Sequence, residues 1–180
     1  MSVKAPETIE TDRCVLSSFL RSDEGEATRL YTDAVVRRFL GGPVSLSRAE
    51  RTFDAWLSGN GSLRRWAVRR KTDGALIGMV SLAPHHEPAD IEISYMFLPE
   101  FWRRGLGTEV VSTVIDYAFQ HLRLPRIVAE TQSANIASRR LLERIGMRVE
   151  RHLVRFNAEQ SLYSMNNPHH YERRDRGLSE

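Results

Sequence analysis

At 180 residues, with 41% hydrophobic and 27% charged residues and a formal net charge of +3, the chain has the size and composition of one soluble globular domain. No apolar run approaches the roughly 20 residues that a membrane-spanning helix needs, and the polar N-terminus does not resemble a signal peptide. Cys14 is the one cysteine, which excludes an internal disulfide and a cysteine-rich metal site. We therefore expect a cytoplasmic protein with a single domain over 1–180, a core over about 8–165 and a loose polar tail over 166–180.

The first part of the chain predicts one strand followed by two helices. Thr8–Leu20 has the alternation of a strand, and a capping pair opens a helix from Ser22 to about Leu40. Gly41-Gly42-Pro43 ends that helix, and a second one is predicted from Ser47 to about Leu57.

The middle of the chain predicts a hairpin, a further strand and the strongest helix. Trp66–Val68 and Leu76–Leu82 flank the turn Lys71–Gly74, which is typical of two antiparallel strands. Ile91–Leu98 alternates between apolar and other residues, and Pro99 ends that strand. Apolar residues three or four apart then predict a helix over Leu106–Leu122.

The last part of the chain predicts a strand, a helix and a strand pair. The strand covers Arg126–Thr131, and the helix runs from about Ala134 to Ile145 with Gly146 as a C-terminal cap. Met147–Phe156 and Gln160–Met165 form the strand pair. The order of helices and strands along the whole chain indicates a mixed α/β domain.

Two arginines and two glycines lie where the strand over Ile91–Leu98 gives way to the strongest helix, in the segment Trp102-Arg103-Arg104-Gly105-Leu106-Gly107-Thr108. The first turn of a helix has unpartnered N–H groups and the positive end of the helix dipole, and glycines let an anion approach the backbone. This chemistry suits a pyrophosphate, although a purely structural turn fits the same residues. The segment matches neither a Walker loop nor the dinucleotide fingerprint, which needs a glycine where this chain has Val110.

Two motifs resemble those of the GNAT acetyltransferases, in particular the RimJ/RimL branch of ribosomal-protein N-terminal acetyltransferases. The first combines Glu92-Ile93-Ser94-Tyr95 with the segment from Pro99 to Glu109, and the second runs from Asn135 to Met147. The resemblance extends over roughly Thr8 to Met165. It implies the GNAT fold, in which a central mixed and twisted sheet of about six to seven strands is flanked by about four helices.

The resemblance also implies where acetyl-CoA binds. The backbone of Met96, Phe97 and Leu98 is expected to hold the pantetheine arm, in a gap where two parallel strands splay apart. The pyrophosphate is expected on the backbone amides of Arg103, Arg104, Gly105, Leu106, Gly107 and Thr108. Asn135, Ser138 and Arg139 are expected to contact the cofactor from the other side, with Arg140 as an alternative to Arg139. A helix cap is the structural alternative for Asn135.

Transfer of an acetyl group to an amine needs a base for the ammonium proton and a proton for the departing thiolate. Glu92 is the first candidate base because its strand leads directly to the cofactor segment, and Glu130 on the following strand is the second. A solvated strand residue or a partner for a charge of the substrate is the alternative for either carboxylate. Many GNAT enzymes carry a tyrosine seven positions after the asparagine of the second motif, where this chain has Leu142. Ser138 or water could protonate the thiolate instead, and Tyr163 is a further alternative. A backbone N–H near Phe97 or Leu98 could polarise the thioester carbonyl.

Two histidine pairs, His85-His86 and His169-His170, raise the question of a metal site. Adjacent side chains on a strand point to opposite faces, and no carboxylate–histidine spacing fits a zinc motif. We expect no metal.

The sequence therefore favours an enzyme that transfers the acetyl group of acetyl-CoA to a primary amine by direct attack in a ternary complex. The acceptor stays open between a protein N-terminus, an amino acid, a polyamine and an aminoglycoside, and the protein is a monomer or a homodimer. The alternative is a CoA-binding sensor or interaction module of the same fold without turnover. A nucleic-acid-binding protein is a third hypothesis, and the small net charge argues against it.

Overall fold

A computed structural model describes residues 7–58, 64–87 and 90–168. They form one mixed sheet of eight strands in the order β1-β2-β3-β4-β5-β6-β8-β7. The strands are β1 (Ile9–Glu10), β2 (Cys14–Ser17), β3 (Arg64–Arg70), β4 (Leu76–Pro84), β5 (Ile91–Phe97), β6 (Arg126–Gln132), β7 (Arg148–Arg155) and β8 (Ala158–Asn166). The helices are α1 (Glu24–Thr32), α2 (Leu46–Leu57), α3 (Leu106–Gln120) and α4 (Ile136–Arg144), and short 3-10 turns cover Arg21–Asp23 and Pro99–Phe101. These elements form the mixed α/β arrangement, one central sheet with four helices, that the sequence predicts.

The sheet has one more strand than expected because the predicted strand over Thr8–Leu20 divides into β1 and β2. A turn at Asp12 and Arg13 separates them, and the hydroxyl of Thr11 closes it by accepting a hydrogen bond of 2.9 Å from the N–H of Cys14. β1 and β2 then pair antiparallel with each other.

The predicted helix over Ser22–Leu40 is wrong over its second half, since α1 ends at Thr32. Asp33 has extended backbone, and its carboxylate accepts hydrogen bonds from the N–H groups of Val35 and Val36, at 2.7 and 3.0 Å. A short polar side chain that bonds to the backbone just ahead of it competes with helix continuation, and turns follow as far as Gly41.

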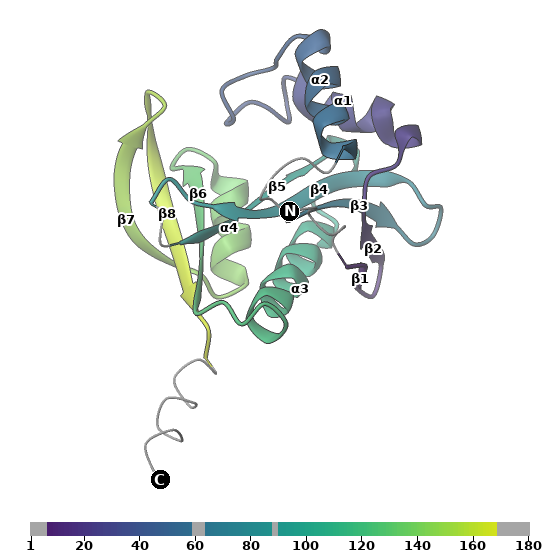
Figure 1. Ribbon diagram of the computed structural model, residues 1–180. Coiled ribbons are helices and arrows are strands. Elements are labelled where there is room, and N and C mark those ends of the chain that lie inside the picture. The colour runs from purple at the N-terminus through teal and green to yellow at the C-terminus, as the bar shows by residue number, and fades with distance from the viewer. Residues whose placement is uncertain (1–6, 59–63, 88–89, 169–180) are drawn as a thin grey trace.

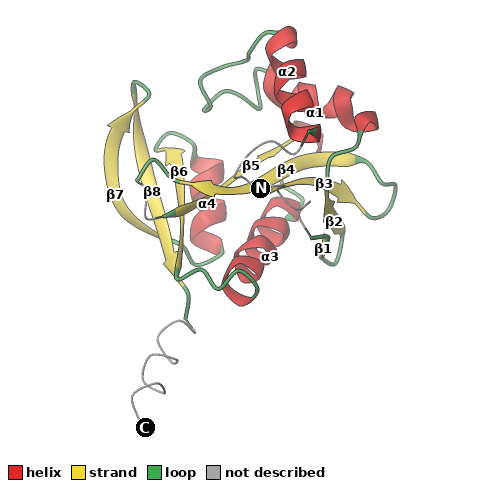
Figure 2. Ribbon diagram, viewed as in Figure 1, coloured by secondary structure: helices red, strands yellow, loops and turns green. Residues whose placement is uncertain are grey.

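Helices cover both faces of the sheet, with α1 and α2 on one face and α3 and α4 on the other (Figures 1 and 2). The larger core lies under α3 and α4 and includes Trp66, Ile93, Val114 and Leu142. The smaller core lies under α1 and α2 and includes Phe53 and Met79. The two faces of the central strands therefore meet different helices, which separates the molecule into an α3/α4 face and an α1/α2 face.

β5 and β6 are the parallel pair at the centre of the sheet, and α3 connects them. Their register contains one residue pair, Glu92 with Val128, whereas β4 and β5 pair along seven residues. The two strands therefore separate beyond Glu92, toward their C-terminal ends. The sequence motifs lie at this opening, on β5, at the start of α3 and at the start of α4.

The described chain ends just after β8. Asn167 directly follows β8 and is buried, and its side-chain amide donates to the carbonyls of Phe119 and Leu124. Of the expected tail over 166–180, residues 169–180 lie outside the described residues. No helix in the described part of the chain has both the length and the apolar character to cross a membrane.

Candidate active site

The segment before α3 forms a tight loop that leaves the first helical turn open. Arg103 and Gly105 both have left-handed backbone, with φ of 60° and 75°, and Arg104 between them does not. Such alternation turns successive N–H groups toward one point. The first intrahelical bond runs from the N–H of Glu109 to the carbonyl of Gly105, and no side chain caps the helix. The N–H groups of the first turn are therefore available to an anion.

Glu109 ties this loop to the turn between β1 and β2. Its carboxylate accepts hydrogen bonds from the Thr11 hydroxyl at 2.5 Å, the Arg13 N–H at 2.8 Å and the Arg13 Nε at 2.6 Å. Arg13 also donates to the carbonyl of Arg104, at 2.9 Å. Burial by itself raises the pKa of Glu109, but these hydrogen bonds outweigh it and hold the pKa below its ordinary value. The loop before α3 is thus stabilised by residues of the turn between β1 and β2.

The two glycines of the segment, Gly105 and Gly107, are needed for different structural reasons. A Cβ on Gly105 would approach only the Arg13 guanidinium, at 3.4 Å, so this glycine serves the left-handed backbone. A Cβ on Gly107 would lie 3.1 Å from Leu141 and 3.3 Å from the Phe97 ring, two partly buried side chains that pack against the core. Gly107 therefore lets the start of α3 pack closely against the end of β5 and against α4. This close packing sets the open helix start beside the opening between β5 and β6.

Backbone groups of β5 face that opening. The N–H of Leu98 donates to the carbonyl of Ile77 on β4, at 2.9 Å. Because the N–H and C=O groups of alternate residues point to opposite sides of a strand, those of Phe97 and Tyr95 point away from β4 and toward β6. Trp102 already uses one of them, since its indole N–H donates to the carbonyl of Phe97 at 2.7 Å. The sequence named Met96, Phe97 and Leu98 for the pantetheine arm, and the strand geometry favours Tyr95 and Phe97.

Glu92 lies where β5 and β6 still touch, on the α1/α2 face. Its neighbours Ile91 and Ile93 pack into the core on the other face, as the alternation predicts. Burial raises the pKa of Glu92, a nearby His85 lowers it less, and the like charge of Glu130 adds to the increase. The Ser94 hydroxyl lies 3.4 Å from its Oε1. A carboxyl whose pKa is moved upward toward neutrality suits a general base.

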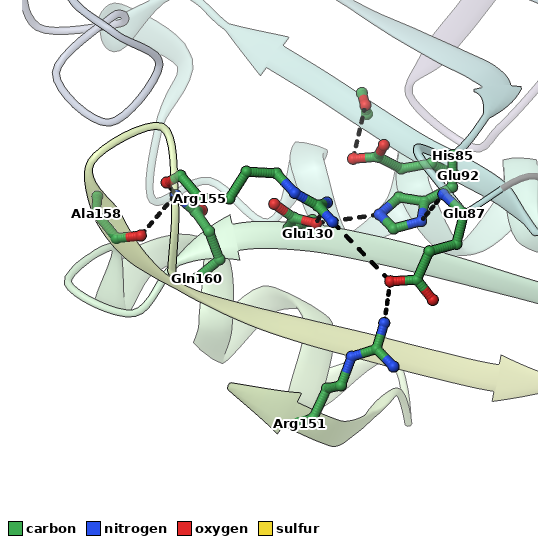
Figure 3. Close-up of polar contacts among 9 residues, drawn as sticks. His85, Glu87, Glu92, Glu130, Arg151, Arg155, Ala158 and Gln160 are labelled. Carbon is green, nitrogen blue, oxygen red and sulfur yellow. Dashed lines mark hydrogen bonds and ion pairs between the residues drawn. The ribbon is translucent and has the colours of Figure 1, made fainter. Parts of the chain in front are cut away.

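Glu130 is held in a charged network instead (Figure 3). Its Oε2 contacts the ring of His85 at 3.0 Å and forms an ion pair with Arg155. The other ring nitrogen of His85, Nδ1, accepts from the N–H of Glu87, which leaves Nε2 to donate to Glu130 when the ring is neutral. The Glu87 carboxylate pairs with Arg151. These contacts make Glu130 a structural and electrostatic neighbour of Glu92 rather than a free base.

The first turn of α4 brings two of the predicted residues to the α3/α4 side of the opening. Asn135 caps the helix, because its side-chain oxygen accepts a hydrogen bond of 3.2 Å from the N–H of Ser138. The Ser138 hydroxyl lies 2.9 Å from the Tyr95 hydroxyl, which comes from β5. Burial raises the pKa of Tyr95 to about 12, so this phenol is protonated near neutral pH. Sequence reasoning missed Tyr95, although its position within the first motif was a usable signal.

Other predicted residues of this helix have structural contacts. Arg139 donates to the Tyr163 hydroxyl and to the carbonyl of Ser133, both at 3.2 Å, while Arg140 is exposed. Tyr163 in turn donates to Glu143, at 2.8 Å. Leu142, which occupies the position of the usual tyrosine, is 0% exposed and belongs to the core. A proton donor at that position is therefore absent.

The histidines do not assemble a metal centre in the part of the chain that the structure describes. No group of three or more histidine, cysteine or carboxylate side chains is placed there to hold an ion. His85 is engaged by Glu130, and His86 packs against Phe156. His169-His170 lies outside the described residues.

Comparison with known proteins gives a consistent result. A family profile described as "Acetyltransferase (GNAT) domain" matches residues 13–148. The chain is 34% identical over 150 residues to "Uncharacterized N-acetyltransferase YoaA" of Bacillus subtilis, which covers 79% of this chain and 83% of that protein.

Solved structures share the fold at low sequence identity. A GNAT-family acetyltransferase from Bacillus anthracis superposes with a TM-score of 0.79 at 20% identity, covering 89% of this chain and 99% of the other. Spermidine N-acetyltransferase from Vibrio cholerae, solved in complex with CoA and spermine, gives a TM-score of 0.73 at 20% identity and covers 86% and 96%.

Proposed function

Since the chain belongs to the GNAT acetyltransferase family, we propose that it transfers the acetyl group of acetyl-CoA to a primary amine by direct attack in a ternary complex. The observation that carries this proposal is the opening between β5 and β6, with an uncapped helix start on one side and the partly buried carboxylate of Glu92 on the other. The two motifs that resemble the RimJ/RimL branch support a place in that branch.

The donor fits the α3/α4 side of the opening. The N–H groups of Leu106, Gly107 and Thr108 can take the pyrophosphate, with Arg103 and Arg104 adding positive charge from exposed positions. The backbone groups of Tyr95 and Phe97 can bind the pantetheine arm as a further strand would. Acetyl-CoA supplies the activated acetyl group, and the protein orients it.

The acceptor then approaches from the α1/α2 face, where Glu92 lies. An ammonium group must lose a proton before it can attack, and Glu92 can take that proton directly or through one water molecule. The raised pKa of Glu92 makes the carboxylate a stronger base than an exposed glutamate.

The departing thiolate needs a proton, and Ser138 is the proposed donor. Its hydroxyl is hydrogen-bonded to Tyr95, whose own proton can replace the one that Ser138 gives up. The pair lies on the cofactor side of β5, opposite Glu92, so base and acid act from different faces. The Tyr95–Ser138 pair thus takes the place of the tyrosine that Leu142 replaces.

A CoA-binding sensor of the same fold is the second candidate function, because the buried Leu142 stands where many GNAT enzymes have a tyrosine. One experiment distinguishes the enzyme from the sensor. The midpoint of thermal unfolding is measured with and without acetyl-CoA, and thiol release is then followed across a panel of amines. We expect a higher midpoint with acetyl-CoA and thiol release with at least one amine. Stabilisation without thiol release supports the sensor, and no stabilisation at millimolar acetyl-CoA contradicts both.

A further inference from the structure

The guanidinium of Arg65 on β3 forms no ion pair with a described carboxylate. Its guanidinium stacks on the ring of Trp56 from α2, 4.7 Å from the ring centroid. Its buried Nε has no hydrogen-bond partner, and the described residues offer the rest of the group neither a hydrogen bond nor an ion pair. Burial lowers the pKa of Arg65, which expresses the free-energy cost of holding this charge away from water.

Two other arginines of this face, unlike Arg65, form ion pairs with described carboxylates. Arg69, four residues further along β3, forms an ion pair of 2.6 Å with Asp23. Arg155 pairs with Glu130 in the network of Figure 3. A partly buried cation without a carboxylate is costly, so its place in the fold calls for an anion from outside.

A second guanidinium lies close by. Arg37 stacks on Tyr31, 5.1 Å from the ring centroid, and the Tyr31 and Trp56 rings contact each other edge-on at 5.3 Å. Arg37 donates to two backbone carbonyls, those of Leu40 and Gly42, and forms no ion pair with a described carboxylate. Both arginines interact electrostatically with the Tyr31 phenol. Two cations therefore flank one pair of aromatic rings.

This cationic pair shares a face of the sheet with Glu92. Arg65 pairs with Ser81 of β4, and Ser81 pairs with Ser94 of β5, so the three side chains form one row across the strands. Glu92 lies two residues from Ser94 and points to the same side. With strands about 4.8 Å apart, the Arg65 and Glu92 backbones are separated by roughly 12 Å, a distance that two long side chains and a small molecule can bridge.

We propose that Arg65, assisted by Arg37, binds a carboxylate of the acceptor, so that the acceptor is an amine that also carries a carboxylate. The inference rests on the proposed function, because Glu92 is assigned to the amino end of the same molecule. The planar fork of arginine matches a carboxylate with two parallel hydrogen bonds, and the Tyr31 and Trp56 rings supply an apolar wall beside it. A polyamine such as spermine, present in the Vibrio cholerae enzyme structure, would bring further cations toward Arg65.

The test uses matched acceptors that differ only in the carboxylate. Glycine, β-alanine, γ-aminobutyrate and the common L-amino acids are each compared with their carboxamides, and spermidine is included. We expect at least one acid to exceed its carboxamide in kcat/KM by about 10- to 100-fold, as a charge-assisted hydrogen bond predicts. Equal rates for every acid and its carboxamide, or faster transfer to spermidine, would overturn the inference while leaving acetyl transfer itself intact.

Variants of two adjacent arginines on β3 provide the test and its matched control. Arg65→Met keeps an apolar stem on Trp56 and should abolish the preference for acids, whereas Arg65→Lys should retain part of it. Arg64→Met is the matched control, because Arg64 points to the other face and donates to Tyr117. The preference should survive in Arg64→Met, and its survival in Arg65→Met would contradict the inference. Arg37→Met repeats the test in case Arg65→Met does not fold.

A binding measurement keeps the inference testable if no amine in the panel releases thiol. The N-acetylated acids and carboxamides are then added to the protein with CoA, and the midpoint of thermal unfolding is recorded. Larger stabilisation by the acids, lost in Arg65→Met, supports carboxylate binding even where the proposed turnover fails. Equal stabilisation by acids and carboxamides contradicts it.

Discussion

Glu92 combines burial with a nearby like charge, and both raise the pKa of its carboxyl. If it is the base, kcat/KM rises with pH as Glu92 loses its proton. Glu92→Gln should lower turnover by about 100-fold near neutral pH and should remove this limb of the pH–rate profile. Affinity for acetyl-CoA, measured by thermal shift, should change little.

Glu130→Gln distinguishes the two carboxylates. Because Glu130 is tied to His85 and Arg155, its loss should lower stability and leave the pH limb in place. If the limb disappears in Glu130→Gln and persists in Glu92→Gln, the two roles are the reverse of those proposed.

The same Glu92→Gln variant should be more stable than the parent at alkaline pH. A pKa that is raised in the folded state means that the fold favours the protonated carboxyl, so parent stability falls as pH rises through that folded pKa. Glutamine does not titrate and avoids this loss. Below the ordinary pKa of 4.5 the difference between the two midpoints should vanish. Equal midpoints at all pH values would mean that Glu92 is not destabilised by its surroundings.

Ser138 and Tyr95 should affect the chemical step rather than binding. Ser138→Ala keeps the backbone N–H that Asn135 caps, so α4 should still form. We expect kcat to fall by about 100-fold in Ser138→Ala and by roughly 10-fold in Tyr95→Phe, with little change in KM for acetyl-CoA. Equal fluorescence-monitored stability of parent and variants serves as the control. An unchanged kcat in Ser138→Ala would assign the proton to water.

Sequence reasoning proposes residues that lie within motifs and does not reach those that depend on distant partners. Glu92 is proposed from a predicted strand, and Asn135 and Ser138 are proposed from the motif that resembles the GNAT family. Tyr95 gains its role from Ser138, 43 residues away in the chain. Whether a described carboxylate lies beside Arg65 depends on segments that are distant in the sequence, and the periodicity of the sequence carries no such information.

Among the elements, α3 depends on a contact that its own sequence does not reveal. Glu109→Ala removes the hydrogen bonds from Thr11 and Arg13 that hold the loop before the helix. We expect a stability loss of about 1–2 kcal/mol, reduced by the exposure of Arg13, and a several-fold higher KM for acetyl-CoA at unchanged kcat. Asp116→Ala, an exposed acid on the same helix, should leave both quantities unchanged.

The pH dependence of Glu109→Ala follows from the lowered pKa of Glu109. A depressed folded pKa contributes stability above the ordinary value of 4.5, and that contribution is lost as pH falls through the folded pKa. The difference between the midpoints of parent and variant should therefore shrink on acidification. A difference that is constant with pH would mean that the effect comes from packing alone.

The types of the elements were predictable from periodicity, and their ends were not. The type of α3 (Leu106–Gln120) was predictable because its long apolar stripe marks a buried helix face directly. The end of α1 at Thr32 depends on one carboxylate, that of Asp33, which bonds to the N–H groups ahead of it. The break between β1 and β2 depends in the same way on Thr11. Such local competition is weaker than an apolar stripe and is easily overlooked.

On the scale of the whole molecule, the proposed reaction uses both faces of the sheet. The α3/α4 face offers backbone N–H groups and the Tyr95–Ser138 pair, and the α1/α2 face offers Glu92 and Arg65, with which no described carboxylate pairs. The order of elements along the chain predicts the sheet and its helices. Strand alternation also predicts on which face of the sheet a side chain lies. The opening between β5 and β6 depends instead on how few residues of the two strands pair, and the sequence pattern does not show this.

The crystal structure of the protein with acetyl-CoA tests the central claim most directly. We expect the pyrophosphate on the N–H groups of Leu106–Thr108, the pantetheine arm between β5 and β6, and the thioester sulfur within hydrogen-bond reach of Ser138, with Glu92 beyond the acetyl group. Acetyl-CoA bound on the α1/α2 face, or no binding at saturating concentration, would contradict the account.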